Sequence, residues 1–187
     1  THLAEGKPVI VETAQRDGFR IAPAQLEAAI TPRTRAFVLN SPSNPTGTMI
    51  GHRELQDLIK AVDDAGGRLI VDEIYQGLVY DDHDYTALQV SDECFVINSF
   101  SKYFGMTGWR LGYVIAPQRF VRPMQKMQQN FFISASAMAQ WAGVEALRSK
   151  EAAEEVARMV STYDERRRYM IQRLKKMGFG ITVEPTG

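Results

Sequence analysis

The strongest constraint on the fold of this chain is the alternation of short apolar, β-branched runs with segments of helical periodicity. The apolar runs fall at residues 9–12, 36–39, 68–71, 94–98 and 111–115. Helical patterns lie between most of these runs, and strands that alternate with helices are typical of an α/β fold. We therefore predict a mostly parallel sheet sandwiched by helices.

The runs at 36–39 and 68–71 are expected to form one strand–helix–strand unit. Apolar residues recur at helical spacing between them, namely Leu55, Leu58, Ile59 and Val62. The pair Gly66–Gly67 then stops the helix. The runs at 68–71 and 94–98 are almost continuously apolar, as strands covered on both faces must be, so we predict that they are the central parallel strands.

Helices are also expected near the start of the chain and over most of its second half. Pro23 suits the first position of a short helix, whose inner face is Leu26, Ala29 and Ile30. Beyond Pro117 the chain is predicted to be helical for most of its remaining length.

A long amphipathic helix is predicted over residues 150–177, because apolar residues keep helical period there while charged residues fill the other face. Gly178 ends this helix. We interpret the charged run 165–168 as part of its solvated face. Residues 181–184 are predicted to be the first strand of a second, smaller body.

The balance of charge argues against some classes of partner. The chain has 187 residues, with 22 Lys and Arg against 22 Asp and Glu. Nucleic acids and membrane surfaces favour a basic excess, so neither is expected, and no run approaches the roughly 18 apolar residues of a membrane span. The single cysteine, Cys94, is expected to be a buried, inert thiol in a reducing cytoplasm. Because the chain starts at Thr1 and stops in a turn signal at 184–187, we expect it to be a piece of a longer protein.

The first segment that carries chemistry is Asn-Ser-Pro-Ser-Asn-Pro-Thr-Gly at residues 40–47, directly after a predicted strand. Its prolines and glycine favour a rigid turn, and a simple turn is one interpretation. The other is functional. Ligands of open α/β sheets bind outside the carboxyl ends of strands, where the amide of Asn44 is able to donate a hydrogen bond to an anionic oxygen.

The second segment is Leu-Ile-Val-Asp-Glu-Ile-Tyr at residues 69–75. Asp72 ends a buried strand, and a buried carboxylate is costly unless a cation or strong donors meet it. Either something positive faces Asp72, or this side chain caps the following turn. The phenol of Tyr75 follows three residues later, whereas Glu73 and Ile74 are expected to point into packing or neighbouring loops.

The third segment, residues 98–113, again follows a buried strand. Lys102 lies among serines, aromatics and glycines, and Arg110 enters the next apolar run. Serine hydroxyls with a guanidinium make a phosphate-binding set, and a lysine in such a setting can act as an amine nucleophile. The competing interpretation is that Lys102 is an ordinary solvated charge.

These segments resemble three successive signatures of the fold type I pyridoxal-phosphate enzymes, and specifically the class I and II aminotransferases related to aspartate aminotransferase. Ser-x-Ser-Lys followed by Gly-Trp-Arg-Leu-Gly is the most diagnostic part. The resemblance covers essentially the whole chain. It implies transfer of an amino group from an amino acid to a 2-oxo acid by a cytoplasmic homodimer. Residues 1–150 would be part of the cofactor-binding large domain, and 151–187 the interdomain helix and the start of the small domain.

The resemblance also assigns roles to the polar residues. Lys102 would bond to the aldehyde of pyridoxal 5'-phosphate and later move a proton between the substrate and the cofactor. Asp72 would pair with the ring nitrogen and keep it protonated. Asn44 and Tyr75 would donate to the phenolic oxygen of the ring.

The phosphate would be held by Ser99 and Arg110, with Ser101 as a helper, whereas Trp109 is expected in the core rather than against the cofactor. Other parts of such a site are expected outside residues 1–187. They are the glycine-rich helix start, the ring-stacking aromatic, the partner subunit's tyrosine and the arginine for the substrate carboxylate. We therefore expect this chain alone to bind cofactor weakly and to turn over no substrate.

Alternatives stay open. A carbon-sulfur lyase would use the same scaffold, and a transcription regulator would use it as a ligand sensor behind a DNA-binding domain. A generic α/β binding domain would leave Lys102 without a special role. The acidic run with one histidine at residues 81–84 resembles a metal cluster by composition, but its acids are adjacent in sequence, so we predict a solvated loop and no metal site.

Overall fold

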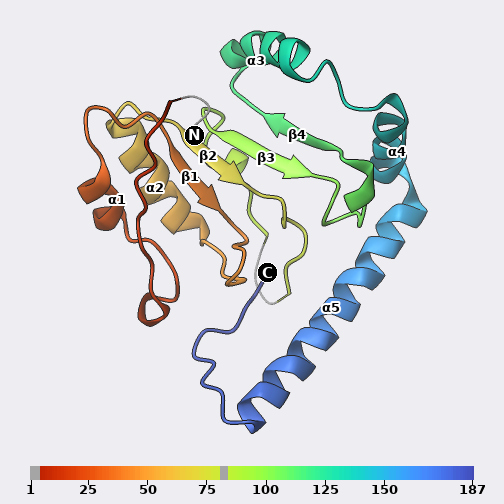
Figure 1. Cartoon of the computed structure of the whole chain (residues 1–187). Helices are drawn as coiled ribbons and strands as arrows, with labels where there is room; N and C mark the ends of the chain where they lie inside the picture. The colour runs from red at the N-terminus through yellow and green to blue at the C-terminus, as the bar shows by residue number, and fades with distance from the viewer. Residues whose placement is uncertain (1–4, 81–83) are drawn as a thin grey trace.

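The computed structural model describes residues 5–80 and 84–187, in which a four-stranded sheet is flanked by helices (Figure 1). The strands are β1 (Phe37–Asn40), β2 (Leu69–Asp72), β3 (Phe95–Ser99) and β4 (Gly112–Ile115). They lie in the order β1-β2-β3-β4, with β1, β2 and β3 parallel and β4 antiparallel to β3. The predicted α/β fold with a mostly parallel sheet is confirmed, and β2 and β3 are its central strands.

The main core lies between the sheet and two helices, α1 (Pro23–Ala29) and α2 (His52–Asp64), which contact each other beside β1 (Figure 1). The helix α2 connects β1 to β2 and confirms the predicted strand–helix–strand unit. Its inward face packs against strand residues such as Val71 and Val96. That face is formed by the predicted apolar set, Leu55, Leu58, Ile59 and Val62, all of which are buried.

The second half of the chain is helical, as predicted, with α3 (Gln118–Phe131), α4 (Ala137–Arg148) and α5 (Lys150–Lys176). A smaller core of Phe100, Leu111 and Ala139 joins α4 to the loops after β3. Gly178 follows α5 with a φ of 89°, a left-handed conformation that suits glycine and ends the helix. Residues 5–80 and 84–187 also contain three short 3-10 helices, η2 (Gln15–Asp17), η3 (Ala87–Gln89) and η4 (Thr107–Trp109).

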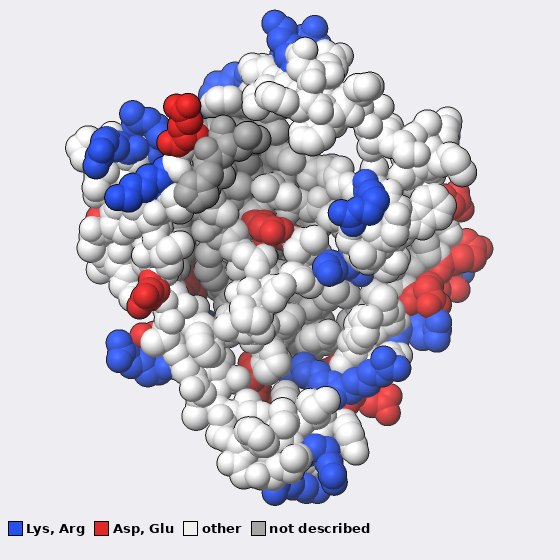
Figure 2. Space-filling view, viewed as in Figure 1, with Lys and Arg blue, Asp and Glu red and all other residues white. Residues whose placement is uncertain are grey.

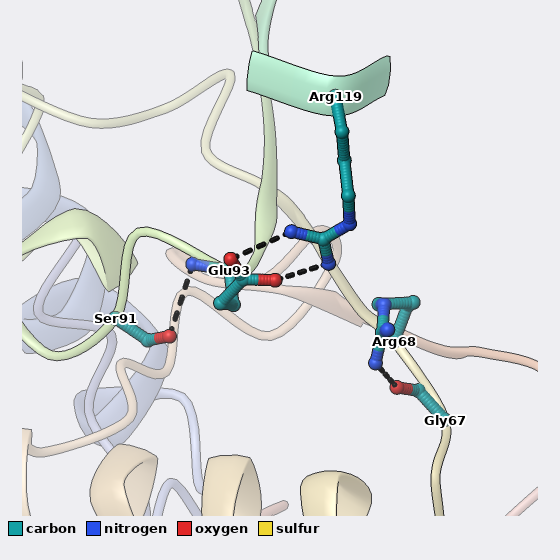
Figure 3. A network of polar contacts seen from close by, with 5 residues as sticks. All are labelled: Gly67, Arg68, Ser91, Glu93 and Arg119. Carbon is teal, nitrogen blue, oxygen red and sulfur yellow. Dashed lines mark hydrogen bonds and ion pairs between the residues drawn. The ribbon is translucent and has the colours of Figure 1, made fainter. Parts of the chain in front are cut away.

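The first turn of α3 is tied to the loop before β3 by an ion pair between Arg119 and Glu93 (Figure 3). Arg119 Nη1 donates to Glu93 Oε1 at 2.7 Å, and a second N–H of the same guanidinium meets the other carboxylate oxygen. The Arg119 guanidinium lowers the pKa of Glu93 below its ordinary value. Ser91 Oγ accepts the Glu93 backbone N–H at 3.1 Å, so the backbone of Glu93 is fixed as well as its side chain.

Two predicted strands are absent from the described part of the chain. Residues 9–12 form no strand, and Val9 and Ile10 are 66% and 79% exposed. Residues 181–184 form none either. A run of β-branched residues becomes a strand only when a neighbouring strand accepts its backbone hydrogen bonds, and neither run has such a neighbour among the described residues.

The predicted burial of the single thiol is confirmed, because Cys94 is 2% exposed. Burial raises the pKa of this thiol to about 11, which keeps it protonated and unreactive at neutral pH. Within the described ranges, no helix is both long and apolar enough to cross a bilayer.

Candidate active site

The carboxyl ends of the parallel strands bring the polar segments together. In the register of the sheet, Asn40 lies opposite Asp72. Asn40 Nδ2 donates to the Asp72 carbonyl at 3.0 Å, and the Ser41 N–H donates to the same oxygen at 3.2 Å. Asn40 Oδ1 then accepts the Asn44 N–H at 2.7 Å. The turn over 40–47 is thus fixed to the end of β2.

Asn44 and Tyr75 contact each other, although they lie 31 positions apart in the chain. Asn44 Nδ2 donates to Tyr75 Oη at 3.2 Å. Because the phenol oxygen accepts this bond, its own proton is left to be donated elsewhere. The two side chains therefore present neighbouring donors.

Lys102 lies against the same phenol. Its Nζ is 5.7 Å from the centroid of the Tyr75 ring, within the range of a cation–π contact. The side chain is half-buried rather than freely solvated. Lys102, Tyr75 and Asn44, with Asp72, are named here the carboxyl-end cluster.

Asp72 is half-buried at the end of β2. Its Oδ1 accepts the Ile74 N–H at 3.1 Å. Asp72 therefore caps the following turn, which is one of the two roles that the sequence left open for it. In residues 5–80 and 84–187, no Lys or Arg forms an ion pair with this carboxylate. A half-buried carboxylate with one donor suits a ligand that brings a positive charge.

Ser99 and Ser101 are also brought together, with their Oγ atoms 3.0 Å apart. Ser99 Oγ accepts the Ser101 N–H at 3.1 Å and lies 3.0 Å from the carbonyl oxygen of Leu111. Arg110 is exposed, and its Nη1 donates to the Thr107 carbonyl at 3.0 Å. The structure thus pairs the serines but directs the guanidinium to its own turn.

One expectation about this region is wrong. Trp109 is 47% exposed and does not belong to the core. It lies in η4, a single short turn that buries none of its residues. An indole in such a turn has no packed layer to enter.

Glu73 follows the prediction that it points into packing. It is 2% exposed, and its Oε1 accepts the Ala87 N–H at 2.7 Å. Its Oε2 is buried with no hydrogen-bond partner in the described ranges. Burial raises the pKa of this carboxyl, because the charged form loses hydration.

A residue near the cluster that the sequence did not single out is Arg167 in α5. It belongs to the run expected to be solvated, yet its side chain is only 9% exposed. Helical spacing was the available signal, because position 167 shares a face with the apolar positions 160, 171 and 174. Arg167 and Asn44 line the same cavity of about 350 Å³.

Figure 2 shows this face of the molecule, with an acidic group near its middle and basic groups beside it.

In the described residues, no three His, Cys, Asp or Glu side chains are grouped as a metal would require. The predicted solvated loop at 81–84 falls largely on residues 81–83, which lie outside the described ranges.

The sequence matches the family model described as aminotransferase class I and II over residues 1–187. It is 36% identical to an aspartate aminotransferase of Pyrococcus abyssi, in an alignment that covers 99% of this chain and 48% of that protein. It is 35% identical to aromatic-amino-acid aminotransferase 2 of Thermococcus litoralis, with the same 99% and 48% coverage. The chain therefore spans about half the length of the curated relatives it matches.

Solved structures of aminotransferases also resemble this chain. Aspartate aminotransferase from Thermus thermophilus with maleate superposes with a TM-score of 0.90 at 35% identity, covering 96% of this chain and 47% of that one. An aromatic aminotransferase from Pyrococcus horikoshii gives a TM-score of 0.92 at 36% identity, covering 97% and 50%.

Proposed function

The chain belongs to the class I and II aminotransferases, and we propose that it supplies the cofactor-binding part of a pyridoxal-phosphate-dependent aminotransferase. The observation that carries this proposal is the meeting of Lys102, Tyr75 and Asn44 at the carboxyl ends of the strands. These residues come from three separate segments, so their meeting is a property of the fold and not of one local motif.

The residues present fit pyridoxal phosphate. A half-buried carboxylate that forms no ion pair within the described ranges, Asp72, suits a protonated ring nitrogen. An amide and a phenol side by side suit an anionic ring oxygen. Two hydroxyls 3.0 Å apart, on Ser99 and Ser101, suit a phosphate, and Arg110 lies at the end of the same loop.

When bound, this cofactor supplies an aldehyde that captures the amino group and a ring that delocalises the electron pair left at the substrate Cα. The side chains of this protein bind and orient the cofactor and carry the proton. Lys102 would be the amine that condenses with the cofactor aldehyde, with loss of water, and, once the amine of the substrate has displaced it, would move the proton at the substrate Cα. Asp72 holds the proton on the ring nitrogen. Asn44 and Tyr75 orient the ring by donating to its oxygen.

The homodimer is part of the same proposal. Six large apolar residues of α3, α4 and their connection are each at least 65% exposed, and we name them the α3–α4 surface: Phe131, Phe132, Ile133, Met138, Trp141 and Leu147. All of them are exposed, Trp141 at 73%. Large apolar side chains exposed in this number on neighbouring elements suit an interface, and we assign them to contacts with a second copy of the full-length protein.

The remaining assignments are also proposals. We propose residues 1–150 as part of the large domain and 151–187 as the linking helix and the start of the small domain. An amino acid and a 2-oxo acid are the proposed substrates, and the matched relatives are named for aspartate and for aromatic amino acids. A cytoplasmic location is supported by the single buried thiol of Cys94.

Reductive trapping tests the proposal directly. The full-length protein is reconstituted with pyridoxal phosphate, treated with borohydride, digested and analysed by mass spectrometry. We expect a pyridoxyl group on Lys102, and none in Lys102→Arg. A pyridoxyl group spread over exposed lysines such as Lys60 would contradict the proposal.

A second assay separates transfer from elimination. Candidate amino acids are supplied with 2-oxoglutarate, and glutamate, ammonia and pyruvate are measured together. We expect glutamate to form with one 2-oxo acid released for each amino group transferred. Ammonia with pyruvate, and no glutamate, would instead identify a lyase.

A further inference from the structure

Arg167 is a cation almost removed from solvent, and each of its three side-chain nitrogens donates a hydrogen bond. Its side chain is 9% exposed, and its Nε and Nη2 donate to Asp164 Oδ1 at 2.9 and 2.7 Å. Its Nη1 donates to the carbonyl oxygen of Pro185 at 2.8 Å, across 18 positions of sequence. The guanidinium also lies 5.1 Å from the centroid of the Tyr80 ring. A buried arginine is tolerated only where acceptors and an opposite charge surround it. Moving the Pro185 carbonyl away would leave a donor of Arg167 unpaired, so this contact holds Pro185 in place.

What Arg167 fixes is the segment at residues 185–187, which packs against the turn over 40–47. The Thr186 and Gly187 N–H groups both donate to the Gly47 carbonyl, at 2.8 and 3.2 Å. The Tyr80 N–H donates to the Thr186 carbonyl at 2.8 Å. A Cβ atom on Gly47 would lie 2.4 Å from the Cβ of Pro185, so the two backbones approach as closely as a glycine allows.

The turn held in this way carries Asn44. Inside it, the Gly47 N–H donates to the Ser43 carbonyl at 2.7 Å, so a displacement of Gly47 is passed to the residue before Asn44. At the other end, Asn40 Oδ1 accepts the Asn44 N–H. The position of Asn44 therefore depends on two contacts of its turn, one with the end of β1 and one with the segment held by Arg167.

We propose that Arg167 is a positioning residue: through Pro185 and Gly47 it sets the place of the turn that presents Asn44 to Tyr75. The inference rests on the proposed function, because it concerns the donor that Asn44 offers to the ring oxygen of pyridoxal phosphate. It adds a contact by which α5, outside the sheet, determines the geometry of the carboxyl-end cluster.

The absorbance of the bound cofactor reports this geometry without turnover. A donor to the ring oxygen stabilises its anionic form, so loss of the donor raises the pH midpoint at which the absorbance changes. In the reconstituted full-length protein, Asn44→Ala sets the scale of that rise. We expect Arg167→Met to raise the midpoint in the same direction by about 0.5 pH unit, as expected for one weakened hydrogen bond.

Matched variants isolate the geometry from charge and from folding. Arg166→Met removes a neighbouring, exposed arginine and leaves the midpoint unchanged. Arg167→Lys keeps the charge beside Asp164 but loses the planar fork, and it still raises the midpoint. In the double variant with Asn44→Ala, Arg167→Met adds no further rise, because both act on the same contact.

Amide hydrogen exchange on the cofactor-free protein gives a second readout. We expect the amides of Thr186 and Gly187 to exchange at least tenfold faster in Arg167→Met than in Arg166→Met. An unchanged midpoint and unchanged exchange in both Arg167 variants, while Asn44→Ala shifts the midpoint, would overturn the positioning role alone. If Asn44→Ala itself leaves the midpoint unchanged, the proposed role of Asn44 fails and the positioning role falls with it.

Discussion

The carboxyl-end cluster and the α3–α4 surface differ in how far this chain satisfies their side chains. In the cluster, Asn44 and Tyr75 are hydrogen-bonded to each other and Asp72 caps its own turn. On the α3–α4 surface, Phe132 and Trp141 are 72% and 73% exposed. An ion pair and packing hold the helices of the second region in place, but its large apolar side chains stay exposed in the described part of the chain.

This difference shows which contacts determine each region. The cluster is specified by strand ends and tight turns, which are built from residues close in sequence and one sheet register. The α3–α4 surface is complete only when something else covers it, because exposed apolar area of this kind is costly in water. We therefore expect changes in the cluster to affect chemistry, and changes on the surface to affect assembly.

The largest expected effect tests the first half of that separation. In the full-length protein, Lys102→Ala is expected to lower the amino-transfer rate by about a thousandfold or more, because the proton at the substrate Cα loses its carrier. Molecular mass by light scattering stays at that of the parent. The control is Lys60→Ala, an exposed lysine of α2, which keeps the parent rate. A Lys102→Ala protein that transfers amino groups at the parent rate would remove the cluster from the chemistry.

The second test places a charge on the α3–α4 surface. Trp141→Glu is expected to weaken association of the full-length protein by about 30-fold or more, the usual effect of losing a central aromatic anchor. Sedimentation over a range of concentrations measures it. Gln56→Glu adds the same charge on α2 and leaves association unchanged. If Trp141→Glu stays a dimer, the surface is covered by another part of the longer protein.

The third test uses urea unfolding to compare a leucine of the main core with a leucine of the α3–α4 surface. Leu58 is fully buried in the main core, and Leu58→Ala is expected to cost about 2–5 kcal/mol of unfolding free energy. Leu147 is 65% exposed, and Leu147→Ala in the dissociated Trp141→Glu background is expected to cost less than about 0.5 kcal/mol. Equal costs would mean that the α3–α4 surface is already buried within one subunit.

The smallest effect concerns the buried carboxyl beside the cluster. Burial raises the pKa of Glu73, so the folded state binds this proton more tightly than the unfolded state does. The stability it contributes is therefore complete below the unfolded pKa, near about 4.3, and is lost as pH rises through the higher folded value. Glu73→Gln keeps an oxygen for the Ala87 N–H and removes the titration.

We expect the unfolding free energy of Glu73→Gln, relative to the parent, to increase between pH 4 and pH 8, because only the parent loses stability as this carboxyl ionises. Urea unfolding at several pH values measures the difference. A difference that stays constant over this range would show that Glu73 has the same proton affinity in both states.

Sequence reasoning predicted the sheet because it follows from local rules, whereas the approach of the polar segments was implied by the family resemblance. Buried parallel strands are read from continuous apolar runs, and their carboxyl ends necessarily share one edge. The contact between Asn44 and Tyr75 was implied by the family resemblance, which assigns both side chains to the same ring oxygen. Its hydrogen bond, and the direction of the Arg110 guanidinium, depend on turn geometry that residue types alone do not fix.

The failures have a common physical cause. Residues 9–12 and 181–184 have strand composition, but a strand depends on a neighbour that the composition does not supply. Trp109 is apolar in type and exposed in fact, because its turn has no layer to join. Arg167 is buried by a segment that returns to a turn more than a hundred positions earlier, and no local pattern encodes that return.

The length of α5 has a mechanical consequence. A helix of 27 residues is about 40 Å long, and it joins α4 at one end to the segment at 185–187 at the other. A rigid helix acts as a lever: Arg167 lies about 25 Å from the start of α5, so a tilt of about 5° at that start would move it by about 2 Å, most of the length of a hydrogen bond. A small rotation near α4 would therefore reach the Pro185 carbonyl through the guanidinium of Arg167.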